Sequence, residues 1–132
     1  MNSTLASIAI DSKGSVSYGA ALILRDLKGK QQGKCPCYIS ATTGQSEALV
    51  YEFLAEMLAL GWVEVSLPEK AAPEFVGIVE ESSRASEKAS DESRPSVWTK
   101  FFRSVGALAN TPRYYIRATK AGEAELNRFR PV

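Results

Sequence analysis

The stretch that most constrains the fold spans residues 39–65 and reads ISATTGQSEALVYEFLAEMLALGWVEV. We expect a short helix to begin at its start and to stop at Gly44, because glycine adopts the left-handed conformation that ends a helix. Ser46 is a natural N-cap for a second helix, whose broad apolar face continues to a further stop at Gly61. WVEVSL, residues 62–67, then alternates apolar and polar side chains, which is typical of a strand. The stretch therefore predicts two helices joined by a tight turn and followed by a strand.

Another helix is expected before this stretch. In SVSYGAALILRDLK, apolar side chains at positions 16, 20, 23, 24 and 27 form a one-sided helical stripe. Two strands joined by a turn at SKGS are a competing interpretation, because the apolar residues at positions 8, 10 and 16 also fit an extended pattern. The spacing favours a helix from Ser17 onward, and residues 4–10 remain ambiguous.

The second half of the chain is expected to add strands and two more helices. FVGIVEE is a candidate strand that would pair with WVEVSL in a hairpin. Residues 81–95, ESSRASEKASDESRP, contain no large apolar side chain, which predicts a flexible linker. A helix capped by Ser96, the strand PRYYIRA and a final helix capped by Thr119 follow. We therefore expect a core at 1–80, a linker at 81–95, and a segment at 96–132 whose helix, return strand and C-terminal helix pack on the core.

The spacing within the opening stretch resembles that of a known class of domains. Val50, Leu54 and Met57 stand six, ten and thirteen positions after Gly44, where they can bury against the first helix. The closing glycine, Gly61, stands seventeen positions after Gly44, and YYIRATKAGEAEL has the form of a return strand and the start of a last helix. This pattern resembles the winged helix-turn-helix domains of bacterial regulators such as the MarR and PadR-like families. The resemblance implies an α+β fold, a winged helix-turn-helix with a flexible insertion and extra C-terminal helices.

The resemblance also implies a function. Members of these families are small transcriptional regulators that bind double-stranded DNA, so the chain is expected to be a regulator and not an enzyme. Exposed positions early in the second helix would contact base edges and phosphates, while the wing tip and the basic chain end would contact the DNA backbone. The expected DNA-contacting residues are Gln45, Ser46, Tyr51, Lys70, Arg113, Arg117 and Lys120.

The charge distribution supports an alternative. Residues 1–46 carry a net charge of +3, residues 47–94 of −7 and residues 95–132 of +5, and the second helix contains no Lys or Arg. A winged helix without cations could dock a protein partner through its acidic face, as an adaptor or inhibitor. The aromatic helix after the linker could form a homodimer or simply close the core. The expected interaction residues are Glu47, Glu52, Glu56, Trp98, Phe101 and Phe102.

A third interpretation is enzymatic. The order IAID, YGAALIL and TTGQSE also resembles ribonuclease H-like folds, metal-dependent nucleases in which a strand Asp and a helix Glu hold magnesium ions. Here these residues would be Asp11 and Glu47, and Glu80 or Glu81 could supply the third carboxylate. The glycine-rich loop expected after the first Asp is short and the chain contains no histidine, so this interpretation ranks below the other two.

The sequence carries no signal for a cofactor, a metal or a membrane. It contains no phosphate loop and no dinucleotide fingerprint, so no cofactor is expected. Cys35 and Cys37 offer a metal only two ligands, and we expect two reduced thiols. No apolar run approaches the roughly 18 residues of a membrane span, and the N-terminus lacks the basic residues of a secretory signal. We expect a cytoplasmic protein.

Overall fold

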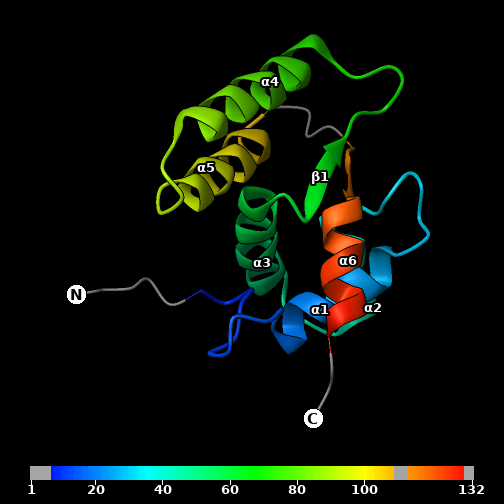
Figure 1. Ribbon diagram of the computed structural model, residues 1–132. Coiled ribbons are helices and arrows are strands. Elements are labelled where there is room, and N and C mark those ends of the chain that lie inside the picture. Colours follow the sequence, from blue (N-terminus) through cyan, green and yellow to red (C-terminus); the bar gives the residue numbers. More distant parts are fainter. Residues whose placement is uncertain (1–6, 109–112, 130–132) are drawn as a thin grey trace.

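The computed structural model describes residues 7–108 and 113–129 and has an α+β fold. Within these residues it contains six helices and a two-stranded antiparallel sheet. Helices α1, α2 and α6 lie at one end of the molecule, the α4–α5 hairpin lies at the other, and α3 and the sheet lie between them (Figure 1). The elements are α1 (Tyr18–Leu27), α2 (Pro36–Thr43), α3 (Glu47–Leu60), β1 (Val63–Ser66), α4 (Pro73–Lys88), α5 (Arg94–Gly106), β2 (Tyr115–Ala118) and α6 (Lys120–Arg128).

The helix, turn, helix and strand of the opening stretch are confirmed. Gly44 ends α2 in the left-handed conformation, with φ of 73°. The Ser46 hydroxyl oxygen caps α3 by accepting a hydrogen bond from the Leu49 amide at 3.2 Å. Gly61, with φ of 78°, ends α3 and lets the chain turn into β1. Each signal acts within one helical turn of its residue, which is why the sequence alone was sufficient.

The first helix is also confirmed, since α1 begins directly after Ser17, whose hydroxyl accepts from the Ala20 amide. The competing extended pattern survives as a single bridge between Ile10 and Val16. Of the ambiguous segment at 4–10, residues 4–6 lie outside the described part of the chain.

Strand β2 occupies the inner position of the sheet. It pairs with β1 on one side, with Val65 opposite Ile116. On its other side Ile116 exchanges two backbone hydrogen bonds with Lys34, at 2.8 and 2.9 Å. The sheet therefore gains a one-residue third strand just before α2, and β1 forms its outer edge.

The core lies where α1, α2 and α3 meet the sheet. Val50, Leu54 and Met57 are fully buried, as their spacing after Gly44 predicts. Helix α6 packs against this core at Gly122, where an added methyl group would collide with the backbone carbonyl of Trp62. The close approach explains why a glycine stands in the first turn of α6.

The expected strand at FVGIVEE is wrong, because these residues open the four-turn helix α4. Phe75 and Val79 are buried four positions apart, which is helical spacing, and Ser86 continues the same face. The Phe75 ring packs against Phe101 of α5 and Tyr114, with ring centroids 6.3 and 5.3 Å apart. The partner of this segment is a helix far along the chain, which a local hydrophobic pattern does not reveal.

The expected flexible linker at 81–95 is also wrong. These residues form the second half of α4, a tight turn and the start of α5. The Trp98 indole N–H donates to the buried Ser86 hydroxyl at 3.1 Å. Arg94 Nε donates to the Ser86 carbonyl at 2.8 Å, and another guanidinium nitrogen donates to the Ala89 carbonyl at 3.0 Å. The serines of residues 81–95 predicted a linker, but their small side chains let α5 approach α4 closely.

Candidate interaction surfaces

Two of the residues expected to read DNA are engaged within the protein. The Gln45 amide turns inward and donates to the Gly19 carbonyl of α1 at 3.2 Å, while its buried Oε1 has no hydrogen-bond partner among the described residues. The Ser46 hydroxyl is occupied by its role as the α3 cap. The Gln45 and Ser46 side chains were expected to face outward, but they stabilise the turn before α3.

Tyr51, the third such residue, packs against the inserted hairpin. Its ring meets Phe102 of α5 edge to face, with centroids 5.0 Å apart, and its phenol group lies close to that of Tyr114. Burial raises the pKa of Tyr51, and the nearby Glu47 carboxylate raises it further. Burial also raises the pKa of Tyr114, with a further contribution from Tyr51. The two tyrosines thus join α3, α5 and the residue before β2 in one packed cluster.

The outward face of α3 is acidic and apolar. Glu47, Ala48 and Glu52 are exposed, and Leu49 and Leu60 are 36% and 40% exposed. Ala48, Leu49, Glu52 and Leu60 lie within one arc of the helix, whereas Glu47 is the first helical residue and lies about 140° around the axis from Glu52. The surface that a DNA reader would insert into a groove therefore offers carboxylates and leucines and no cation.

Glu56 differs from the other two glutamates of α3. Its carboxylate accepts hydrogen bonds from the Ile8 and Ala9 amides at 3.1 Å each, and also from the Ser7 hydroxyl. It therefore fixes the N-terminal segment to α3. Of the three glutamates expected to bind a partner, Glu47 and Glu52 remain exposed.

The expected cations are spread over separate elements. Lys70 is exposed in the loop after β1, Arg113 is exposed before β2, and Lys120 is exposed at the first residue of α6. Arg117 is paired across the sheet with Glu64, with Nε and Oε2 2.6 Å apart. None of these cations lies on α3.

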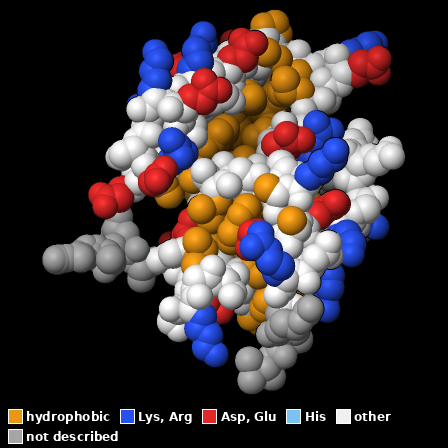
Figure 2. All heavy atoms as spheres, viewed as in Figure 1, with side chains coloured by type: hydrophobic (Ala, Val, Ile, Leu, Met, Phe, Trp, Pro, Cys, Tyr) orange, Lys and Arg blue, Asp and Glu red, His pale blue; other side chains and the backbone are white. Residues whose placement is uncertain are grey.

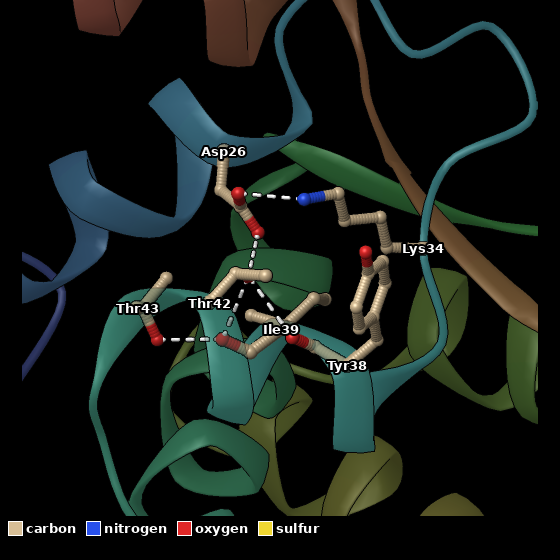
Figure 3. Close-up of polar contacts among 6 residues, drawn as sticks. All are labelled: Asp26, Lys34, Tyr38, Ile39, Thr42 and Thr43. Carbon is tan, nitrogen blue, oxygen red and sulfur yellow. Dashed lines mark hydrogen bonds and ion pairs between the residues drawn. The ribbon is translucent and has the colours of Figure 1, made fainter.

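A polar cluster joins α1 to α2, as Figure 3 shows. The Asp26 carboxylate accepts from Lys34 Nζ at 2.7 Å and from the Thr42 hydroxyl at 2.6 Å. Lys34 Nζ also lies 4.9 Å from the centre of the Tyr38 ring. Both charged side chains are mostly buried, so Lys34 stabilises the fold.

The aromatic side chains of α5 close the core and do not form an exposed dimer surface. Trp98 and Phe101 are buried, and Phe102 is half-buried between Tyr51 and Tyr114. Within the described chain these rings are therefore largely covered, and the expected homodimer stays a prediction.

The carboxylates of the nuclease interpretation do not gather. Asp11 accepts from the Lys13 and Ser15 amides and so holds a turn, while Glu47 starts α3 and Glu80 lies on α4. Across residues 7–108 and 113–129, no three acidic, cysteine or histidine side chains stand close enough to hold a metal ion.

Cys35 and Cys37 are free thiols at the start of α2, with their sulfur atoms 3.3 Å apart. The hydrogen bond with Cys35 raises the pKa of the Cys37 thiol, and burial adds to the effect. A raised pKa keeps the thiol protonated and lowers its reactivity as a nucleophile.

Sequence reasoning missed a groove between the α4–α5 hairpin and the sheet. Its volume is about 270 Å³, and Figure 2 shows it as a hydrophobic band between the hairpin and the body of the protein. The alternation of WVEVSL signals a strand, but nothing local indicates that a groove lies beside it. The lining residues are Leu58, Val63, Glu64, Val65, Val79, Ser83 and Trp98.

Comparison of the chain with protein-family models, with curated proteins and with solved structures finds no match. Within the described residues, none of the helices combines the length and the hydrophobicity needed to cross a lipid bilayer.

Proposed function

We propose that this protein is a protein-recognition module built on a winged-helix-like fold. The observation that carries the proposal is the exposed surface of α3, which presents Glu52 near Leu49 and carries Glu47 at its first residue and Leu60 at its last. Acidic and apolar groups side by side suit a protein partner whose surface is basic.

The order of the elements supports the winged-helix part of the proposal. A helix, a one-residue strand, two helices joined by a tight turn, and two antiparallel strands follow each other along the chain. The α4–α5 hairpin connects the two strands in the place where a winged helix has its wing tip. The MarR and PadR-like families remain the proposed relatives on the strength of the spacing from Gly44 to Gly61.

Electrostatics favours protein over DNA as the partner of α3. DNA binding depends on Lys and Arg that neutralise phosphates and release counterions. Glu47 and Glu52 would instead repel the DNA backbone, and Gln45, Ser46 and Tyr51 already have partners within the protein.

The test is a selection of random peptides displayed on yeast against the full-length protein. We expect the enriched peptides to be rich in Lys and Arg, and we expect Glu47→Gln with Glu52→Gln to lower their binding at least tenfold. Glu74→Gln, which removes an exposed carboxylate at the start of α4, is the matched control and should leave binding unchanged. Enrichment without any charge preference, or equal loss in the control, would contradict the proposal.

A second candidate function, DNA binding, rests on a different surface. Arg25, Lys28 and Lys30 are exposed at the end of α1, and none of them forms an ion pair within the described part of the chain. Gly122 packs against Leu24, which brings Lys120 toward the same region. Fluorescence anisotropy with a mixed duplex pool at 50 and 200 mM salt tests this candidate, since phosphate contacts require affinity to fall steeply with salt. Salt-independent binding, or none, would contradict it.

A further inference from the structure

Two free thiols stand together at the start of α2. The sulfur atoms of Cys35 and Cys37 lie 3.3 Å apart, which is within hydrogen-bond distance for sulfur. Cys37 is exposed and Cys35 is partly exposed, so neither side chain belongs to the buried core. Unpaired cysteines are ordinarily among the most buried residues of a protein, where they act as small apolar groups. The exposure of this pair therefore favours a role in thiol chemistry over a role in packing.

The backbone holds the two cysteines in place. The residue before Cys35 is hydrogen-bonded to β2 through its amide and its carbonyl. The Cys35 carbonyl accepts hydrogen bonds from the Tyr38 and Ile39 amides, each at 3.1 Å. Pro36 is buried as the first residue of α2, and its ring fixes φ at the helical value. The fold therefore fixes the spacing of the two thiols.

This spacing fits a disulfide. Because Pro36 has a helical backbone, the Cα atoms of Cys35 and Cys37 are about 5.4 Å apart. Disulfides bridge Cα atoms that are roughly 4.4 to 6.8 Å apart, so the backbone has no need to move. The sulfur atoms must approach each other by about 1.3 Å to reach the length of a disulfide bond, which rotation of the two side chains can supply.

A metal site is the competing role for a pair of thiols. Structural zinc sites use four protein ligands, most of them Cys or His. Within the described ranges, 7–108 and 113–129, no three acidic, cysteine or histidine side chains gather into a possible metal site. The pair therefore has the geometry for oxidation and lacks the further ligands that zinc needs.

The raised pKa of the Cys37 thiol has its main cause within the pair. The hydrogen bond with Cys35 raises this pKa most, followed by burial and by negative charge on Cys35. When the Cys35 sulfur is bonded to another sulfur it carries no charge, so that contribution ends. Cys37 then loses its proton more readily and becomes a better nucleophile, because the thiolate is the reactive form.

We propose that Cys35 and Cys37 form a redox-active dithiol that exchanges with low-molecular-weight disulfides. The thiolate of one cysteine attacks a sulfur of glutathione disulfide, which forms a mixed disulfide and releases one glutathione. The thiolate of the other cysteine then attacks the first cysteine's sulfur, which forms the Cys35–Cys37 disulfide and releases the second glutathione. The two cysteine protons pass to the departing glutathione thiolates. Two protein thiols are thus oxidised, and one glutathione disulfide is reduced.

The Cys35–Cys37 disulfide is expected to be reversible. It closes a loop of three residues, and a disulfide constrains the unfolded chain less as its loop becomes shorter. Exposed disulfides are also reduced by the glutathione pool more readily than buried structural ones. Excess reduced glutathione should therefore restore both thiols. This activity goes beyond the proposed function and uses none of the α3 residues on which that function depends.

The first test incubates the full-length protein with glutathione disulfide, blocks the remaining thiols with N-ethylmaleimide and measures the intact mass. We expect chains that carry neither glutathione nor maleimide, and chains with two maleimides after excess reduced glutathione is added. Chains that hold glutathione stably, or that still take up two maleimides after the oxidation step, would overturn the proposal. A disulfide-linked dimer on a non-reducing gel would also overturn it, because the bond would then join two chains.

Cys35→Ser and Cys37→Ser provide the matched variants. The chain contains no other cysteine, so each variant can form a mixed disulfide but no internal one. We expect each variant to hold at least ten times as much bound glutathione as the unmodified protein. Equal amounts in all three proteins would contradict the second, intramolecular step. Because both side chains lie outside the core, the variants should keep the Tm of the unmodified protein in circular dichroism, which shows that any difference comes from the thiols.

Discussion

The hydrogen bond between Trp98 and Ser86 gives a quantitative test of how the α4–α5 hairpin is held. Both side chains are buried, and the indole N–H donates to the serine hydroxyl at 3.1 Å. Ser86→Ala leaves the indole donor buried without a partner, which costs about 1 to 3 kcal/mol. Alanine is a better helix former than serine, so the substitution regains roughly 0.5 kcal/mol of stability. The expected net loss in the free energy of unfolding is therefore about 0.5 to 2.5 kcal/mol.

Urea denaturation of the full chain, followed by circular dichroism, measures this loss. Ser83→Ala is the matched control, because Ser83 is a half-buried serine of the same helix, and it should be neutral or slightly stabilising. Trp98→Phe removes the same donor, so adding Ser86→Ala to it should cost clearly less than Ser86→Ala alone. If Ser86→Ala unfolds at the same urea concentration as Ser83→Ala, the hydrogen bond does not hold the hairpin and the reasoning is refuted.

Three further predictions follow from buried contacts. Asp26→Ala should cost about 3 kcal/mol in urea denaturation because it leaves Lys34 mostly buried without its carboxylate, and an unchanged stability would contradict that role. Gly122→Ala should cost more than 2 kcal/mol, since the added methyl group meets the Trp62 carbonyl, and a Tm equal to that of the unmodified protein would contradict the close packing of α6. Burial raises the pKa of Tyr114 above its ordinary value of 10, so the folded state keeps a proton that the unfolded state loses at higher pH. The contribution of Tyr114 to stability should be level below pH 10 and should fall above it by at most about 1.4 kcal/mol per pH unit, so Tyr114→Phe should make the total fall less steep; an identical slope in the variant would rule out this phenol as one of its sources.

The parts of the fold that the sequence predicts correctly depend on local signals. Helix caps and stops act on backbone groups within one turn, so the residue types alone are sufficient to predict them. The caps are Ser17, Ser46 and Thr119, and the stops are Gly44 and Gly61.

The hairpin could not be predicted in this way. FVGIVEE looks extended because its β-branched side chains favour strands, and the serines of 81–95 look like a linker because they are small and polar. Their structure is decided by the aromatic face of α5, whose Phe101 and Trp98 pack against Phe75 and Ser86. Tertiary contacts override weak local preferences here.

The candidate site shows the same division. The acidity of α3 is a property of composition, and the exposure of Glu47 follows from its place at the first residue of the helix. The inward turn of Gln45 toward Gly19 and the contact of Tyr51 with Phe102 depend on distances between elements. The groove beside β1 likewise depends on where α4 lies, so no local pattern in the strand could have revealed it.

Backbone amide NMR spectra of the full-length protein, titrated in parallel with a selected peptide rich in Lys and Arg and with a duplex DNA pool, test the central claim most directly. Recognition of a basic protein segment by α3 predicts that the peptide shifts the amides of Ala48 and Glu52 and that DNA leaves these amides unshifted. Shifts of these amides by DNA, together with no response of them to the peptide, would contradict the account.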